Sequence, residues 1–324
     1  MIQTILLSLL ATAPTVRSLP TAPTVGLLVV AHGAGPEWNR RVREAVSQVG
    51  WPRGPVATAF LMGPESETAG WGAGVDSLTG RGATEIVVVP LMVSSAGAHF
   101  RQARYYAGEL PELPRSLAGH ANHRSATGPP VPIRVTAALD GAPELGQLLG
   151  DIWWSLERID RRRSVVYVAH GPSSEDDAAR WLVDLERATQ PAGATDLRRV
   201  VKLIRDDAAP AVRARAVAEL RDTIATLARE TADSVTVLPI LISSGTIDRV
   251  TIPTDLAGLP IRYVPISLAP SPHLARWIER VAEARLTGTD GPALPAGRAG
   301  ARLGHDLRRG PPEVRCKTGA APPL

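Results

Sequence analysis

Residues 26–46 read "GLLVVAHGAGPEWNRRVREAV", and this stretch decides the fold because a version of it returns at 164–185 as "SVVYVAHGPSSEDDAARWLVDL". Each copy is a continuous apolar run, a turn that contains His-Gly, and an amphipathic segment with helical spacing. A run that is apolar at nearly every position is typical of a parallel strand buried on both faces. The stretch therefore predicts a buried strand followed by a helix, once in each half of the chain.

Two further pairs of segments repeat in the same order. The segment "EIVVVPLMVSSAGAHF" (85–100) matches "SVTVLPILISSGTIDRV" (234–250), and "IRVTAALDGAPELGQLLGDIW" (133–153) matches "IRYVPISLAPSPHLARWIERV" (261–281). Strands that alternate with helices imply a parallel sheet with helices on both faces. We therefore expect an internally duplicated α/β protein with two similar parallel-sheet α/β/α domains.

The repeats divide the chain into an N-terminal extension (1–23), a first domain (24–155), a second domain (160–287) and a tail (288–324). The extension holds a short apolar stretch followed by small residues, which resembles a signal peptide but has no Lys or Arg before it. The apolar stretch is also too short to span a membrane. We expect a cytoplasmic protein, with export as the alternative, and a disordered tail because apolar periodicity is nearly absent there.

Composition excludes several classes of protein. The formal charge of +4 is not accompanied by any nucleic-acid recognition motif, so we expect no nucleic-acid partner. The single cysteine, Cys316, excludes a disulfide framework and a thiolate metal cluster. The sequence has no P-loop, nucleophile elbow, dinucleotide-binding fingerprint or zinc-protease helix, and we expect no organic cofactor.

Two histidines follow predicted strands of the first domain. His32 ends the first apolar run, and His99 comes just after the small-residue turn "SSAG" that follows the run "IVVVPLMV". Because parallel strands end at the same edge of a sheet, both imidazoles are expected in one crevice. A pair of imidazoles there can bind a divalent ion such as Co²⁺, Ni²⁺, Fe²⁺ or Zn²⁺, or act as general bases. A histidine taken alone at such a place more often caps a turn.

The repeat supplies an internal comparison for this pair. The second domain keeps a histidine, His170, at the position of His32, but the position of His99 is taken by Asp248. The pattern predicts one complete site in the first domain and one degenerate copy in the second.

The chain resembles the class II tetrapyrrole chelatases, of the sirohydrochlorin cobaltochelatase and ferrochelatase type, in their two-repeat form. The resemblance rests on the strand before "AHG", on the segment from Val56 to Phe100, and on "PSPHLARW" near the end of the second domain. It implies insertion of a divalent metal, Co²⁺ or Fe²⁺, into sirohydrochlorin or a related acidic tetrapyrrole, as in cobalamin biosynthesis. The metal is then a substrate.

The same resemblance assigns roles to residues. His32 and His99 match the two active-site histidines of the family, which would hold the metal and accept the pyrrole N–H protons. Small and cationic neighbours suit a broad acidic ring, and the candidates for binding it are Ser94, Ser95, Gly97, Arg101 and Tyr105. The helical spacing of Arg101, Arg104, Tyr105 and Tyr106 fits an ordinary exposed helix face equally well.

The chain also departs from the family. Met62 stands where the family usually carries a glutamate, and Ala34 replaces a serine. Glu65 and Glu67 are the candidates to supply the missing carboxylate, and the simpler interpretation is that both are solvated loop residues. His120 and His123, in the loop sequence "HANH", have a spacing that could collect a metal but are better explained as solvated residues.

Three hypotheses remain at this stage. The favoured one is a metal-inserting enzyme with an acidic tetrapyrrole and a divalent ion as partners. The first alternative is a relative of these enzymes that binds a metal or a tetrapyrrole as a carrier or sensor, suggested by Met62 and Asp248. The second is a structural α/β protein whose histidines only cap turns. The sequence leaves open which metal and tetrapyrrole are bound, and the oligomeric state.

Overall fold

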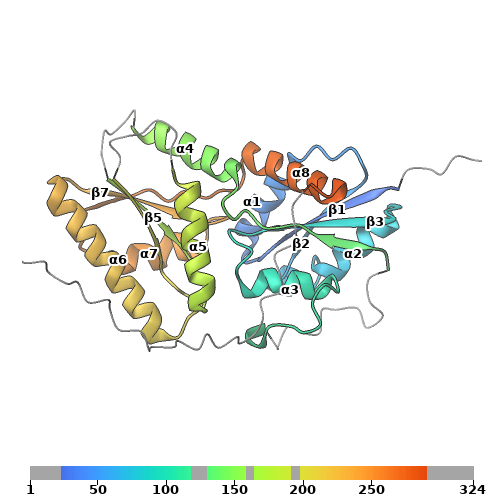
Figure 1. The fold of residues 1–324 in the computed structure, drawn as a ribbon, viewed down its shortest axis with the longest axis horizontal. Helices are drawn as coiled ribbons and strands as arrows, with labels where there is room; N and C mark the ends of the chain where they lie inside the picture. The colour runs from blue at the N-terminus through green and yellow to red at the C-terminus, as the bar shows by residue number, and fades with distance from the viewer. Residues whose placement is uncertain (1–22, 118–129, 158–163, 191–197, 290–324) are drawn as a thin grey trace, which may run out of the picture. The chain divides into compact units, whose positions relative to one another are not determined.

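Two parallel four-stranded sheets, one in each half of the chain, form the framework of this computed structural model (Figure 1). The structure describes residues 23–117, 130–157, 164–190 and 198–289, all of which belong to one compact unit. The strand orders are β2-β1-β3-β4 and β6-β5-β7-β8, so the second sheet repeats the topology of the first. The predicted fold class is confirmed, and the physical basis is the repeated run of buried strand, turn and helix.

The first half alternates strands and helices as its sequence pattern predicts. Its elements are β1 (Val25–Ala31), α1 (Pro36–Ser47), β2 (Val56–Phe60), a short 3₁₀ turn (Pro64–Ser66), α2 (Trp71–Gly80), β3 (Glu85–Leu91), α3 (Ala98–Tyr106), β4 (Ile133–Val135) and α4 (Pro143–Glu157). Every residue of β1 is buried. Its neighbours β2 and β3 both run parallel to it, which explains why the strand is apolar without alternation.

The second half follows the same order. Its elements are β5 (Ser164–Ala169), α5 (Glu175–Ala188), β6 (Arg198–Leu203), α6 (Pro210–Thr231), β7 (Val235–Ile240), a π-helical turn (Ile247–Thr251), α7 (Ile252–Asp255), β8 (Ile261–Tyr263) and α8 (Pro272–Thr287). Serine caps begin two of the helices. The Ser174 hydroxyl accepts from the backbone N–H of Asp177 in α5, and the Ser271 hydroxyl accepts from that of His273 in α8.

Alternate residues of the strands face two different cores. On β1, Leu27 and Val29 join a core shared by both halves, whereas Leu28 and Val30 pack on the other face of the sheet against α2 and α3. The outer face of the second sheet packs in the same way against α6 and α7. Each sheet is therefore covered on both faces.

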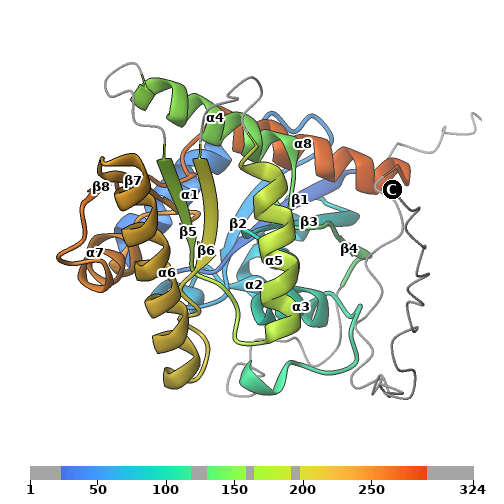
Figure 2. The same ribbon diagram turned by 60° about the vertical axis from the view of Figure 1, so that its left-hand side comes forward.

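The last helix of each half packs against the other half. Helix α8 contacts β3 and α1, and α4 contacts α5 and α8, as Figures 1 and 2 show. Polar contacts support this exchange: the Arg280 guanidinium of α8 donates to both carboxylate oxygens of Glu144 of α4, at 2.6 and 2.7 Å. The four helices α1, α4, α5 and α8 contribute to one continuous core between the sheets.

The predicted domain boundaries, 24–155 and 160–287, remain a prediction. The structure adds that the two halves exchange their last helices, so neither range contains all of the packing of its own sheet. The proposed signal peptide, the loop histidines His120 and His123, and nearly all of the tail lie outside the described residues. Within the described part of the chain, no helix combines the length and apolarity that crossing a bilayer requires.

Candidate metal-binding active site

The two histidines singled out from the sequence meet at the end of the first sheet. His32 directly follows β1 and His99 lies in the first turn of α3, after the loop that leaves β3. Because β1 and β3 are neighbouring parallel strands, both chains leave the sheet at the same edge. The ring centroids are 4.5 Å apart, with the ring planes at 89°.

The backbone after His32 depends on glycine. Gly33 has a φ of 87°, and a Cβ at this position would lie 2.3 Å from the carbonyl oxygen of Met62. Only glycine adopts this conformation without strain and leaves room for the neighbouring strand end. The His-Gly pair therefore places an imidazole at the edge of the sheet and turns the chain towards α1.

Hydrogen bonds determine the tautomer of each ring. The Nδ1 atom of His32 lies 2.8 Å from the carbonyl oxygen of Gly33, and Nδ1 of His99 lies 2.9 Å from Oε1 of Gln102. The Gly33 carbonyl oxygen can only accept. The Gln102 amide donates its Nε2–H to the Tyr106 hydroxyl at 3.0 Å, so its Oε1 atom is the acceptor that faces His99. Each Nδ1 must then donate, so each neutral ring carries its lone pair on Nε2.

The environment keeps His32 in the neutral form. Burial and the neighbouring His99 ring lower its pKa from the ordinary 6.5 to about 4, against a small opposing effect of the Gly33 carbonyl. A neutral imidazole is the form that binds metal ions. At neutral pH this ring is therefore a ready ligand.

The histidines open into a cavity of about 480 Å³ between the two sheets. Its walls come from both halves of the chain, and its lining includes His32, Trp38, Ser94, Gly97, His99, Arg101, His170, Asp177, Trp181 and Asp207. Two contacts cross the boundary between the halves beside it. The Arg101 guanidinium pairs with the Asp177 carboxylate at 2.9 Å, and the Trp181 indole N–H donates to the Ala96 carbonyl.

The structure divides the predicted substrate-binding residues into two groups. Ser94, Gly97 and Arg101 line the cavity. Ser95 is not among the lining residues: its hydroxyl donates to a carboxylate oxygen of Asp140 at 2.7 Å and holds the loop after β3. Tyr105 is likewise absent from the lining and packs against the apolar cluster under α2 and α3.

Asp248 has a structural role in the second half. Its carboxylate is buried and accepts from the Ser244 hydroxyl and the Gly245 backbone N–H, both at 2.6 Å, so it stabilises a turn. His170 instead lines the same cavity as His32 and His99. The degenerate character of the second half stays a prediction; the structure adds that both halves contribute residues to the cavity of His32 and His99.

Two residues that line the cavity, His170 and Asp207, were not predicted as site residues from the sequence. The signal for His170 was present, because the repeat aligns it with His32. What the repeat does not reveal is that the two halves face each other, so that equivalent residues meet in one place. Asp207 follows β6 and had no counterpart in the matched segments.

The carboxylate that the family carries at the position of Met62 has no replacement from this segment among the described residues that line the cavity. Neither Met62, Glu65 nor Glu67 is among the lining residues, and the Glu65 carboxylate is paired with Arg43 of α1. The simpler interpretation of these glutamates as loop residues therefore fits the structure.

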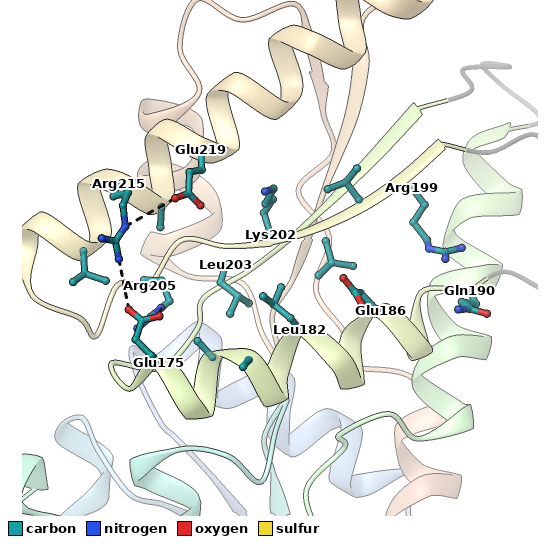
Figure 3. Close-up of a pocket in the computed structure, with 16 residues that line it drawn as sticks. Glu175, Leu182, Glu186, Gln190, Arg199, Lys202, Leu203, Arg205, Arg215 and Glu219 are labelled. Carbon is teal, nitrogen blue, oxygen red and sulfur yellow. Dashed lines mark hydrogen bonds and ion pairs between the residues drawn. The ribbon is translucent and has the colours of Figure 1, made fainter. Parts of the chain in front are cut away.

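A larger cavity of about 620 Å³ lies along β6, between α5 and α6 (Figure 3). Its charged side chains largely pair with one another: Glu175 contacts both Arg205 and Arg215, and Arg215 also contacts Glu219. No histidine lines it. The histidine cavity is the better candidate for metal chemistry.

The two imidazoles of His32 and His99 suit a metal ion that is bound temporarily and then passed on. Among the described residues, no group of three or more His, Cys, Asp or Glu side chains is arranged to hold a metal. Two imidazoles leave most of the coordination positions of a divalent ion open for other ligands, which is the property a site needs when its metal is passed on.

Comparison with known proteins supports the resemblance. The CbiX family model matches residues 26–152. The chain is similar in structure to SirB from Bacillus subtilis with Fe³⁺, with a TM-score of 0.55 and 18% identity over 83% of this chain and 98% of that one. It is also similar to the sirohydrochlorin chelatase SirB from Bacillus subtilis subspecies spizizenii in complex with cobalt, with a TM-score of 0.51 and 16% identity over the same shares.

The chain is similar in structure to a third protein, DR2241 from Deinococcus radiodurans, which is a multi-domain protein with structural similarity to chelatases. Its TM-score is 0.51 at 15% identity, over 81% of this chain and 55% of that one. No curated protein gives a significant match. The family match bears out the predicted resemblance to class II chelatases, and the structural likenesses confirm the predicted fold.

Proposed function

We propose, because residues 26–152 match the CbiX family model of class II chelatases, that this protein inserts a divalent metal ion, Co²⁺ or Fe²⁺, into sirohydrochlorin or a related acidic tetrapyrrole. The observation that carries the proposal is the pair formed by His32 and His99. Their rings lie in contact, and their hydrogen bonds place both lone pairs on Nε2. Both rings border a cavity that is open to a larger ligand.

The chemistry fits this arrangement. Metal insertion breaks two pyrrole N–H bonds, forms metal–nitrogen bonds and releases two protons, with no change of oxidation state. Two neutral imidazoles hold the ion without adding charge, and the open coordination positions accept the pyrrole nitrogens. Arg101 lines the cavity, and its guanidinium is the kind of group that binds the carboxylates of an acidic tetrapyrrole.

The sharpest test follows the visible absorption of sirohydrochlorin mixed with Co²⁺ over time. We expect the wild type to accelerate metallation above the spontaneous rate and His99→Ala to lose the acceleration. His273→Ala is the matched control, because His273 contacts Asp151 and Arg276 outside the cavity. Repeating the assay with Fe²⁺ and Ni²⁺ identifies the metal, and no acceleration with any of the three ions would refute the proposal.

A carrier or sensor of metal or tetrapyrrole is the second candidate. It is favoured by one observation: the strand end that carries Met62 brings no carboxylate to the cavity. This candidate predicts that the protein binds Co²⁺ or sirohydrochlorin, with a spectral shift, yet leaves the metallation rate unchanged. Rapid turnover that His99→Ala abolishes would exclude it.

A further inference from the structure

The wall of the cavity contributed by the second half carries an imidazole flanked by two carboxylates. His170 directly follows β5, and the loop after β6 places Asp206 and Asp207 beside it. Its Nδ1 atom lies 3.3 Å from Oδ2 of Asp206, and its Nε2 atom lies 3.5 Å from Oδ1 of Asp207. His170 and Asp207 both line the cavity that holds His32 and His99.

Surrounding contacts hold this group in place. The backbone N–H of Arg205 donates to the His170 carbonyl at 2.7 Å, and the Arg205 guanidinium donates to the carbonyls of Pro172 and Ser173 at 2.7 and 2.8 Å. These bonds tie the loop after β6 to the loop after β5. Asp206 is oriented by Arg213 of α6, at 2.7 Å.

The reaction needs a destination for two protons, and the described residues of the first half that line the cavity include no carboxylate. His32 and His99 are committed to the metal through Nε2, and the strand end at Met62 has no carboxylate. We propose that His170, supported by Asp206 and Asp207, accepts the pyrrole N–H protons during metal insertion. The inference rests on the proposed function and assigns the two halves different tasks: the first holds the ion, and the second removes the protons.

The proton transfers balance as follows. One pyrrole N–H bond breaks, its electron pair forms the metal–nitrogen bond, and the proton binds to Nε2 of His170. The Asp206 carboxylate, 3.3 Å from Nδ1, stabilises the resulting imidazolium. Asp207, whose side chain is 55% exposed, lies beside Nε2 and leads the proton to water. His170 then accepts the second proton in the same way.

The electrostatics of the group suit this role. Burial alone would lower the pKa of His170, but the close contact with the Asp206 carboxylate and the negative charges of Asp207 and Asp206 outweigh it, so the pKa is raised above 6.5. The other charged or titratable groups described around His170 are Arg213, which pairs with Asp206, the His32 and His99 rings that line the same cavity, and the Arg101–Asp177 pair. His170 is thus a stronger base than His32.

The test compares His170→Ala, His170→Gln and the control His273→Ala for Co²⁺ affinity and for metallation rate against pH. We expect both His170 variants to keep wild-type Co²⁺ affinity and to lose rate on the order of 10²-fold, with added imidazole restoring part of the rate to His170→Ala. In the wild type, kcat/KM should fall as His170 becomes protonated, at a pH above 6.5. This acidic limb should be absent from both variants.

A second variant keeps the imidazole. Asp207→Asn removes an exposed carboxylate and should shift the acidic limb to lower pH, since one of the charges that raise the His170 pKa is gone. If the wild type is active and His170→Ala has the same rate and the same pH profile, this inference is overturned and the proposed function stands. Co²⁺ affinity that falls together with the rate would also overturn it, because His170 would then bind the metal. Absence of turnover in the wild type would refute the proposed function instead.

Discussion

A single half-buried ring, His32, couples the chemistry of the site to the stability of the protein. Its pKa is about 4 in the folded state and 6.5 ordinarily. Between these values the unfolded chain binds a proton that the folded chain does not, so stability falls as the pH falls from 6.5 to 4. We expect the free energy of unfolding of the wild type to drop by up to about 3 kcal/mol relative to His32→Asn across this window. Urea unfolding of both proteins at several pH values measures this difference, and parallel pH curves would contradict the prediction.

Gln102 determines how His99 presents itself to a ligand. It is fully buried, and its amide joins the His99 ring to the Tyr106 hydroxyl. Gln102→Leu removes the acceptor that holds Nδ1–H, so we expect Co²⁺ affinity to fall about 10- to 100-fold. Competition with a chromophoric chelator measures the affinity. Gln147→Leu, at an exposed position on α4, is the control, and a folded Gln102→Leu protein with wild-type affinity would show that the bond is not needed.

At the scale of elements, α8 belongs to the packing of the first sheet although it is the last helix described. Trp277 of α8 is completely buried in the core that joins the two halves. Trp277→Ala should therefore lower the free energy of unfolding by about 3–5 kcal/mol, because a large cavity is left behind. Trp154→Ala removes the same side chain from a position on α4 that is 48% exposed and should change stability by less than about 0.5 kcal/mol. Urea unfolding tests both, and equal losses would contradict this account.

At the scale of the whole molecule, the exchange of α4 and α8 makes the two halves dependent on each other. A chain that ends after residue 160 lacks α8, which covers part of the first sheet, and a chain that begins at residue 161 lacks α4. We expect neither fragment to unfold cooperatively alone, and the two together to form a complex that binds Co²⁺. Circular dichroism during urea unfolding, with size-exclusion chromatography of the mixture, measures this. Cooperative unfolding of the first fragment alone would show that the halves are independent domains.

The sequence by itself determined the duplicated α/β architecture and the meeting of His32 with His99. Both follow from local pattern: continuous apolar runs indicate buried parallel strands, and parallel strands bring their ends to one edge. The tertiary structure decided what depends on contacts between distant segments. It brought His170 and Asp207 to the cavity, exchanged the last helices, and directed Ser95 to Asp140 and Tyr105 to the apolar cluster. No local signal encodes these outcomes, because the packing of two halves against each other decides which side chains share a cavity and which side of a short helix faces it.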